Sequence, residues 1–252
     1  MIHFVGAGSG AADLITVRGA NMLQDADVII YAGSLVNPAL LDYAKEGCEI
    51  HNSAHMTLEE VVEVMKAAEA AGKTTVRLHT GDPSLYGAHR EQMDLLDEAG
   101  IAYDVVPGVS SFCGAAAALK AEYTLPNVSQ SVIITRMEGR TPVPEGEKLR
   151  KMASHGCTMV LFLSTSLLDC AVEELLEGGY SPDTPAAIVY KATWPDEQVW
   201  RCTVGTLAET ARQAGVKNTA LICIGGFLGD AYERSRLYDP TFTHMFRTAT
   251  GD

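Results

Sequence analysis

The sequence lacks the features that mark membrane-spanning, secreted and nucleic-acid-binding proteins. It has no apolar run approaching the roughly 18–20 residues that span a bilayer. It begins MIHFVGAG, without the basic region or the cleavage site of a secretory signal. Its formal net charge is −13, whereas phosphate binding requires a cationic surface. We therefore expect a cytoplasmic protein that has neither a membrane nor a nucleic acid as its main partner.

Cysteine and histidine give no sign of a metal centre or of a disulfide framework. The six cysteines form no CxxC pair, and none stands at zinc-ligand spacing from a histidine. We expect them to be reduced, because disulfides are rare in cytosolic proteins. Among the seven histidines, His51 and His55 bracket a loop rather than sharing a helix face. The sequence therefore predicts no metal site.

The negative charge is unevenly distributed along the chain. Residues 1–125 carry 17 acidic and 7 basic side chains, whereas residues 126–252 carry 15 and 12. An anionic substrate is therefore expected to bind mainly to the second half. The alternative is that the charge simply keeps the protein soluble.

Apolar, β-branched strands alternate with amphipathic helices, which is typical of α/β proteins with mostly parallel sheets. At 252 residues the chain is long enough for two domains. We predict α/β domains at 1–125 and 126–252, each with a mostly parallel or mixed sheet flanked by helices, and a frayed tail at about 241–252. The segments VWRCTVG and TALICIG make the second half rich in strands, which favours a mixed sheet there.

Hydrophobic periodicity assigns the individual elements. Strands are expected at 2–6, 27–32, 74–79, 102–106, 131–136, 158–164, 186–192, 199–205 and 219–227. Helices are expected at 13–24, 57–71, 86–99, 110–120, 145–155, 167–177 and 206–214. The helix at 57–71 has the clearest boundaries, because Thr57 and Glu60 match a capping box and Gly72 follows its last turn.

The first glycine-rich loop, GAGSGA at 6–11, matches the GxGxxA pattern of dinucleotide-binding proteins. Those proteins hold the ribose with an acidic residue roughly 20 positions further along. Here the second strand ends YAGSLVNP, which has no carboxylate near that position. The absence of this carboxylate therefore argues against a nicotinamide cofactor.

Two further loops, TGDPSLYG at 80–87 and PGVSS at 107–111, each follow a predicted strand. Loops at neighbouring strand ends form the crevice where open α/β sheets bind ligands. Gly81 allows close approach of the backbone, Asp82 can accept hydrogen bonds and Pro83 stiffens the turn. The alternative for this loop is an ordinary strand-to-helix turn in which Asp82 caps the helix.

Together these two loops resemble the tetrapyrrole methylases, which transfer a methyl group from S-adenosylmethionine to a porphyrin-like ring. One branch, which methylates C-11 of precorrin-4, is similar over four longer strings, and its cobalt-precorrin-4 version is the most similar. These strings are YAGSLVNPALLDY (31–43), EYTLPNVSQSVIITRMEGRTPVPE (122–145), YKATWPDEQ (190–198) and FLGDAYERSRLYDP (227–240). The chain departs from the family at Ser9, where proline is usual, and at Ala11-Ala12, where Asp-Pro is usual.

The resemblance implies the tetrapyrrole methylase fold, with the cofactor cleft between the two domains. It also implies a homodimer, with S-adenosylmethionine as the cofactor and S-adenosylhomocysteine as its product. The cofactor contacts that it implies are Thr80, Gly81, Asp82, Leu85, Ser110, Ser111, Leu163, Ala192 and Ala220. For Leu163 and Ala220 the alternative is plain core packing.

The implied substrate is a ring that bears eight carboxylates, and arginine side chains bind carboxylates in two-point fashion. The substrate-binding candidates are Arg136, Arg140, Ser34 and His55. Lys148, Arg150 and Lys151 lie near Glu145 and Glu147 and are better explained as a solvated helix face. Arg18, near the first loop, is a weaker candidate.

The implied reaction is a direct displacement, in which C-11 attacks the sulfonium methyl group. An enamine-like ring carbon needs no strong base, so we assign no catalytic residue, although Asp82 and Tyr86 lie nearest. Three alternatives stay open: a metal-free precorrin-4 substrate, a methylase for another tetrapyrrole carbon or for uroporphyrinogen, and a carrier that binds the ring without catalysis. An RNA methyltransferase of the same fold is disfavoured by the negative charge.

Overall fold

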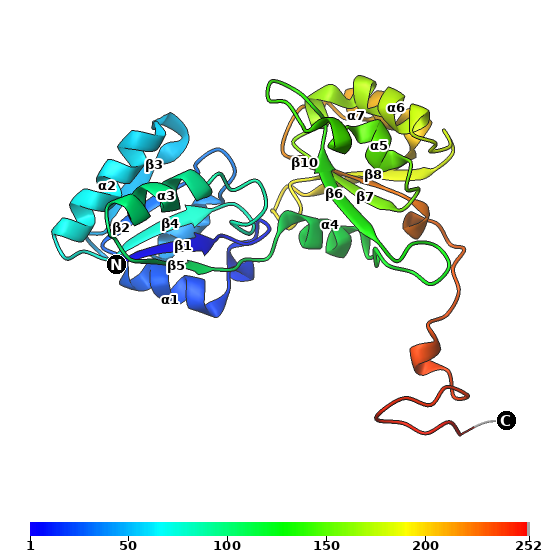
Figure 1. Ribbon diagram of the computed structural model, residues 1–252, viewed down its shortest axis with the longest axis horizontal. Helices are drawn as coiled ribbons and strands as arrows, with labels where there is room; N and C mark the ends of the chain where they lie inside the picture. Colours follow the sequence, from blue (N-terminus) through cyan, green and yellow to red (C-terminus); the bar gives the residue numbers. More distant parts are fainter. Residues whose placement is uncertain (251–252) are drawn as a thin grey trace. The chain divides into compact units, whose positions relative to one another are not determined.

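The structure, a computed structural model, describes residues 1–250 (Figure 1). The chain divides into two compact units. Unit 1 comprises Met1–Ala115 together with Lys191–Glu197, and unit 2 comprises Ala116–Tyr190 and the chain from Gln198 onward. The boundary that we predicted, after residue 125, therefore lies within unit 2, and the short segment 191–197 is part of unit 1 despite its distance in sequence.

Unit 1 is built on a five-stranded parallel sheet with the order β3-β2-β4-β1-β5. Its strands are β1 (Ile2–Gly6), β2 (Val28–Tyr31), β3 (Glu49–Asn52), β4 (Thr75–His79) and β5 (Tyr103–Val106). In a parallel sheet all carboxyl ends meet at one edge, so the loops that follow these strands lie along that edge.

Helices cover both faces of this sheet, as the alternation of apolar strands and helices predicted. Helix α1 (Val17–Asp25) lies on one face, and α2 (Leu58–Ala70) and α3 (Arg90–Glu98) lie on the other (Figure 1). Successive side chains of β1 enter opposite cores: Val5 packs with Leu23 of α1, whereas Phe4 belongs to the cluster that contains Leu96 of α3. Because successive side chains of a strand point to opposite faces of the sheet, β1 contributes residues to the hydrophobic cores on both faces.

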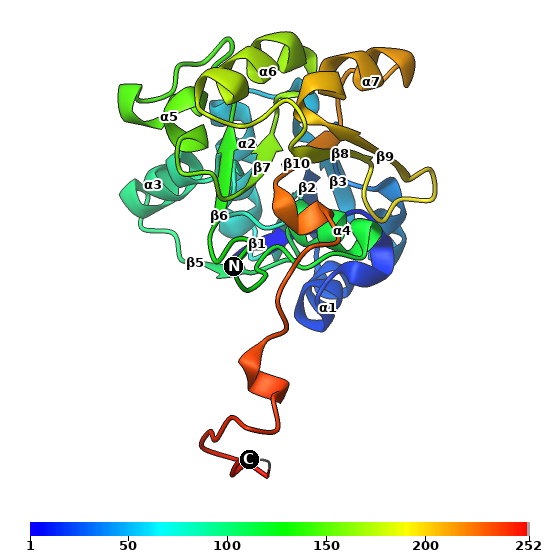
Figure 2. The same ribbon diagram turned by 90° about the vertical axis from the view of Figure 1, so that its right-hand side faces the viewer.

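Unit 2 contains a mixed sheet with the order β6-β7-β10-β8-β9. Its strands are β6 (Val132–Arg136), β7 (Thr158–Phe162), β8 (Pro185–Tyr190), β9 (Gln198–Thr203) and β10 (Ala220–Ile224). Only β6 and β7 pair in parallel, and the other pairs are antiparallel. Helices α5 (Leu149–Ala153), α6 (Leu168–Glu177) and α7 (Leu207–Gln213) lie together on one face (Figure 2). The prediction of a mixed second sheet is confirmed.

Several local features differ from the predicted elements, and one of them is α1, which begins at Val17 rather than at 13. Strand β3 was missed because its sequence, EIHN, is short and mostly polar. Helix α3 begins at Arg90 rather than at 86, since Tyr86 and Ala88 adopt left-handed backbone angles that end a right-handed helix. The expected helix at 145–155 is broken at Lys148, whose ψ of 140° is extended. Helix α4 (Ser111–Leu119) forms where it was expected.

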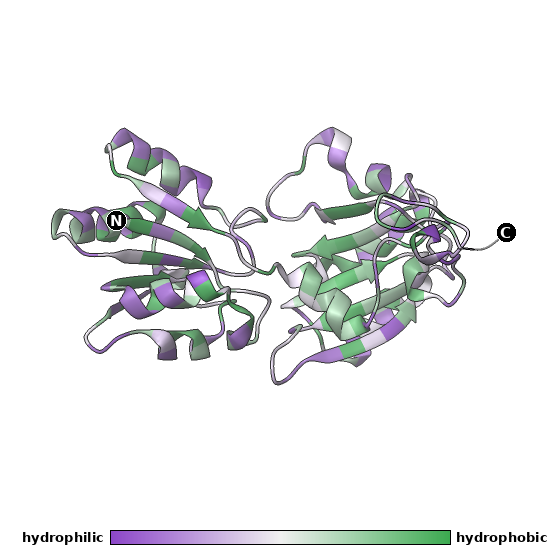
Figure 3. Cartoon of the chain, turned by 90° about the horizontal axis from the view of Figure 1, so that it is seen from below, coloured by the Kyte–Doolittle hydropathy of each residue, from purple (hydrophilic) through white to green (hydrophobic). Residues whose placement is uncertain are grey.

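The colouring of Figure 3 follows this construction: the strands are largely hydrophobic and the helices carry the hydrophilic stretches. Within residues 1–250, no helix has both the length and the apolar character that crossing a bilayer requires. In the predicted frayed tail, residues 241–250 form no helix, and a single turn pairs His244 with Arg247. The last two residues of that prediction lie outside the described part of the chain.

The capping box of α2 provides a test of the fold. Thr57 Oγ1 accepts from the Glu60 amide at 3.3 Å, and the Glu60 carboxylate accepts from the Thr57 amide at 2.7 Å. We expect Thr57→Ala to cost about 1 kcal/mol of unfolding free energy, because an amide of the first turn loses its acceptor. Thermal unfolding followed by circular dichroism should show a midpoint lower by about 4 °C. Thr248→Ala, at an exposed position outside any helix, should leave the midpoint unchanged.

Candidate active site

Three glycine-bounded loops meet at the carboxyl edge of the unit 1 sheet. They follow β1, β4 and β5, and β1 pairs with both of the other strands. Gly8 and Gly81 exchange two backbone hydrogen bonds of 3.2 and 3.1 Å, which join the first loop to the second. The Gly108 amide donates to the Asp82 carboxylate at 2.8 Å, so the sequence-predicted loops at 80–87 and 107–111 are also brought together as expected.

The backbones of these loops approach so closely that side chains are excluded. A Cβ atom at Gly108 would lie 2.2 Å from the Gly81 carbonyl oxygen. A Cβ atom at Gly6 would lie 2.6 Å from Gly108 Cα. Because these contacts are with backbone atoms, no rotamer change can relieve them. Glycine is required here for packing, and the loops meet through their main-chain groups.

Asp82 ties the second loop to the third. Its carboxylate accepts from the Gly108 amide at 2.8 Å and from the Ser84 amide at 2.9 Å, and also from the Ser84 hydroxyl. Burial acts to raise the pKa of this carboxyl, but the hydrogen bonds from Ser84 and Gly108 outweigh it and leave the pKa below its usual range. The alternative of Asp82 as a helix cap is wrong, because α3 begins only at Arg90.

Ser110 and Ser111 lie beside this junction, at the start of α4. The Ser110 carbonyl accepts from the Cys113 amide at 3.0 Å, and its side chain is buried. The Ser111 amide nitrogen would lie 3.4 Å from a Cβ atom at Gly81. Thr80 and Leu85 are half-buried in the same loop. Six of the predicted cofactor residues thus share one edge of one unit.

The segment 191–197 also packs against the first glycine loop. The Ala192 carbonyl oxygen would lie 2.6 Å from a Cβ atom at Gly10. Thr193 Oγ1 accepts from the Ala11 amide at 2.9 Å and lies 3.2 Å from the Ser9 hydroxyl. Ser9 replaces the family's usual proline, which has no hydroxyl to offer Thr193. Sequence reasoning missed Thr193, because nothing local links it to a loop that is so distant along the chain.

Ser34 and His55 follow β2 and β3, and both are exposed. Their loops touch, since a Cβ atom at Gly33 would lie 2.2 Å from the Asn52 side-chain oxygen. Asn37 Nδ2 donates to the Gly10 carbonyl at 2.9 Å, which connects the loop after β2 to the first glycine loop. These two substrate candidates therefore lie along the same sheet edge as the cofactor candidates of unit 1.

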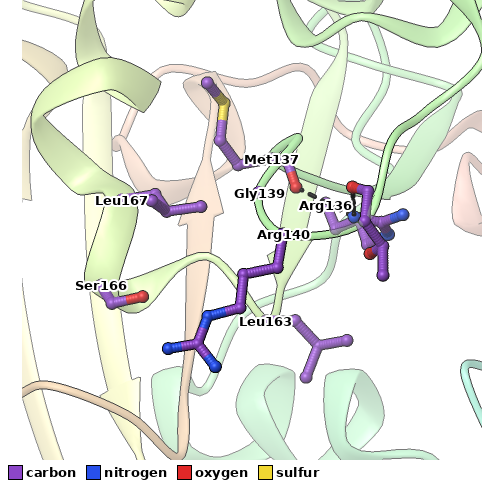
Figure 4. Close-up of a pocket in the computed structure, with 8 residues that line it drawn as sticks. Arg136, Met137, Gly139, Arg140, Leu163, Ser166 and Leu167 are labelled. Atoms are coloured by element: carbon purple, nitrogen blue, oxygen red, sulfur yellow. Dashed lines mark hydrogen bonds between the residues drawn. The ribbon is translucent and has the colours of Figure 1, made fainter.

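In unit 2, a pocket of about 740 Å³ brings together three other predicted residues, Arg136, Arg140 and Leu163 (Figure 4). Arg136 ends β6 and Leu163 follows β7, the parallel neighbour of β6. The remaining lining residues are Met137, Gly139, Thr141, Ser166 and Leu167.

The two arginines differ in what they contact. The Arg136 guanidinium donates to the carbonyls of Thr141 at 3.2 Å and Pro142 at 2.7 Å, so it braces the loop that carries Arg140. Arg140 is exposed and has no ion-pair partner among residues 1–250. Its guanidinium lies between Ser166 and Leu163 in Figure 4. Arg140 is therefore the better placed of the two to bind a carboxylate.

Leu163 is not a core residue. It has a left-handed φ of 52° and is 61% exposed, so the packing alternative for Leu163 is wrong. Ala220 is different: it is buried, and its carbonyl accepts from Thr165 Oγ1 at 3.3 Å. Sequence reasoning missed Ser164, a buried residue whose hydroxyl accepts from the Met137 amide at 2.7 Å and fixes the wall of the pocket.

The other basic candidates do not line this pocket. Lys148 and Lys151 pair with Glu145, and Arg150 pairs with Glu174 and Glu177. This matches the predicted solvated face. Arg18 is exposed on α1. All six cysteines are free thiols, and no cluster of histidine, cysteine and carboxylate side chains suited to a metal ion occurs in the described chain.

Comparison with known proteins assigns this arrangement to a family. The family model for tetrapyrrole (corrin/porphyrin) methylases matches residues 1–208. The chain belongs to the tetrapyrrole methylase family. A dinucleotide-binding fold is therefore rejected, and the recognition of this family from the two loops is confirmed.

Individual tetrapyrrole methylases resemble the chain over almost its whole length. The cobalt-precorrin-4 C(11)-methyltransferase of Methanocaldococcus jannaschii is 54% identical over 247 residues, which are 98% of this chain and 95% of that protein. A solved structure of cobalt precorrin-4 methyltransferase, a cobalamin biosynthetic enzyme, matches with a TM-score of 0.89 at 49% identity, covering 91% of this chain and 96% of that one. Uroporphyrin-III C-methyltransferase from Thermus thermophilus, solved with S-adenosylhomocysteine, has a TM-score of 0.76 at 25% identity and covers 90% of this chain and 98% of that one.

The contact between Gly108 and Gly81 can be tested by adding one methyl group. We expect Gly108→Ala to lower the unfolding free energy of unit 1 by about 2 kcal/mol, because the new Cβ atom collides with backbone. Chemical denaturation followed by fluorescence measures this. Gly146→Ala is the matched control, since its Cβ atom meets nothing within 4 Å. Equal stability of the two variants would show that the loops do not pack as described.

Proposed function

We propose that this chain transfers a methyl group from S-adenosylmethionine to C-11 of cobalt-precorrin-4 during cobalamin biosynthesis. The observation that carries the proposal is the 54% identity, over 98% of the chain, to a protein of that name. The loops of unit 1 and the arginine-lined pocket of unit 2 supply chemistry that suits the two substrates.

The cofactor is proposed to bind at the loop edge of unit 1. An adenine and a sulfonium require shape and carbonyl dipoles rather than a strong counter-charge, and the glycine loops present backbone. The proposed contacts in unit 1 are Thr80, Gly81, Asp82, Leu85, Ser110, Ser111 and Ala192. A structural relative solved with S-adenosylhomocysteine supports this cofactor. Leu163 and Ala220 stay predicted contacts from unit 2.

The methyl-transfer step itself requires no strong base from the protein. The electron pair of the enamine-like C-11 forms the new carbon–carbon bond, and the methyl–sulfur bond breaks with its pair on sulfur. The positive charge passes from sulfur to the ring nitrogen that is conjugated with C-11. Catalysis then comes from holding carbon, methyl and sulfur in line. Asp82 is unsuited to proton abstraction, because its carboxylate already accepts three hydrogen bonds and its pKa is lowered. We assign it a positioning role.

The substrate carboxylates are proposed to bind Arg140, which has no competing ion pair in the described chain. Arg136 acts by bracing the Arg140 loop through two carbonyls. Ser34 and His55 are exposed at the ends of β2 and β3 and stay candidates for contact with the ring. We also propose a homodimer in the cytoplasm, which light scattering of the purified protein and cell fractionation test.

The proposed activity is tested by anaerobic incubation with S-adenosylmethionine and cobalt-precorrin-4. The expected product has gained one methyl group, and carbon NMR should place it at C-11. Reaction only with metal-free precorrin-4 would support the aerobic alternative, and methylation of another carbon or of uroporphyrinogen would support a different methylase. Ring binding without methyl transfer would support the carrier alternative.

Two substitutions separate cofactor binding from substrate binding. We expect Asp82→Ala to weaken S-adenosylmethionine binding about tenfold, because the Gly108 amide and Ser84 lose their common acceptor. Arg136→Ala should leave cofactor binding unchanged and raise the KM for the tetrapyrrole. Calorimetry and steady-state kinetics measure the two effects. Asp94→Ala, at an exposed carboxylate on α3, is the control, and parent-like cofactor binding by Asp82→Ala would refute the site.

A further inference from the structure

A group of buried polar side chains lies next to the loop that follows β4 and makes no direct contact in the chemical step proposed above. Arg77 and His79 belong to β4, and Gln92 belongs to α3; they are 6%, 2% and 5% exposed. No carboxylate within residues 1–250 forms an ion pair with Arg77. Burial lowers the pKa of Arg77 to about 10, so the side chain is still charged at neutral pH. An unpaired charge in a core is costly and calls for an explanation.

Hydrogen bonds connect this charge to the loop through a single side chain. Arg77 Nη1 donates to the Ile30 carbonyl at 3.2 Å, and Arg77 Nε donates to Gln92 Oε1 at 3.1 Å. Gln92 Nε2 in turn donates to the Ala88 carbonyl at 2.9 Å. The centre of the sheet is thereby linked to the backbone just beyond the proposed cofactor residues.

The segment held by Gln92 has an unfavourable backbone conformation. Tyr86 and Ala88 have φ angles of 56° and 46°, a region that penalises any residue with a Cβ atom. Gly87, between them, packs so tightly that a Cβ atom would lie 2.2 Å from the Pro83 carbonyl oxygen. A strained segment persists only where its surroundings hold it in place.

We propose that Gln92 is a positioning residue for methyl transfer, which holds the Ala88 carbonyl from Arg77 and so keeps the 80–88 loop in its cofactor-binding conformation. The proposal rests on the proposed function, because it assumes that this loop binds S-adenosylmethionine. The proposal also gives the buried Arg77 charge a role. Because Arg77 donates to the Gln92 side-chain oxygen, the Gln92 side-chain nitrogen is directed toward the Ala88 carbonyl.

The test replaces Gln92 with methionine, which keeps the length of the side chain and removes both hydrogen bonds. Amide hydrogen exchange at residues 84–89 should quicken in the absence of any ligand. The Kd for S-adenosylhomocysteine and the KM for S-adenosylmethionine should rise about tenfold. The kcat at saturating cofactor should stay close to that of the parent. Gln24→Met, at an exposed glutamine on α1, is the matched control and should change none of these.

A second substitution distinguishes positioning from general destabilisation. Ala88→Gly removes the penalty for a left-handed φ, so the loop then needs less support from Gln92. The double variant Gln92→Met/Ala88→Gly should therefore recover most of the lost affinity. Loss of core stability alone would not be repaired by a glycine in the loop.

The outcomes separate the two claims. Parent-like exchange and affinity in Gln92→Met would overturn the positioning role, as would faster exchange with unchanged affinity, or a double variant that binds no better than the single one. Failure of the parent itself to bind S-adenosylhomocysteine would overturn the proposed function, and the parent's own titration reveals that case first.

Discussion

The close approach of three backbone loops at one edge of the unit 1 sheet is the constraint on which the rest of the structure depends. Gly6, Gly81 and Gly108 come together because none of them has a side chain. The parallel sheet makes this possible, since β1 lies between β4 and β5 and all three strands end at the same edge. Asp82 then fixes the junction with hydrogen bonds from the second and third loops.

This construction would explain why the proposed methyl-donor site contains so few charged groups. A sulfonium that leaves as a neutral thioether is best served by shape, exclusion of water and alignment. The charged residues are used elsewhere: Arg77 lies next to the loop that follows β4, Arg136 braces a loop in unit 2, and Arg140 is exposed in a pocket. The hydrogen-bond partners of each guanidinium therefore indicate whether that arginine supports a loop or is free to bind a ligand.

Much of the fold could be predicted from the sequence, because the apolar strands and the capped helix at 57–71 have clear periodicity. Strand β3 could not, since EIHN forms a strand only by pairing with β2. The loops at 80–87 and 107–111 could be recognised by their glycines and their position after strands. The contact of Thr193 with Ser9, and the engagement of Arg136 by carbonyls, depend on tertiary placement that no local pattern encodes. The left-handed angles at Tyr86 and Ala88, which shorten α3, are of the same kind.

The central claim is that the glycine-loop edge of unit 1 binds the methyl donor. The most direct measurement is the difference in amide hydrogen exchange of the full chain with and without saturating S-adenosylhomocysteine. Binding at this edge predicts slower exchange in the loops at 80–87 and 107–111. Exchange that is unchanged in both loops, with protection appearing only elsewhere in the chain, would contradict it.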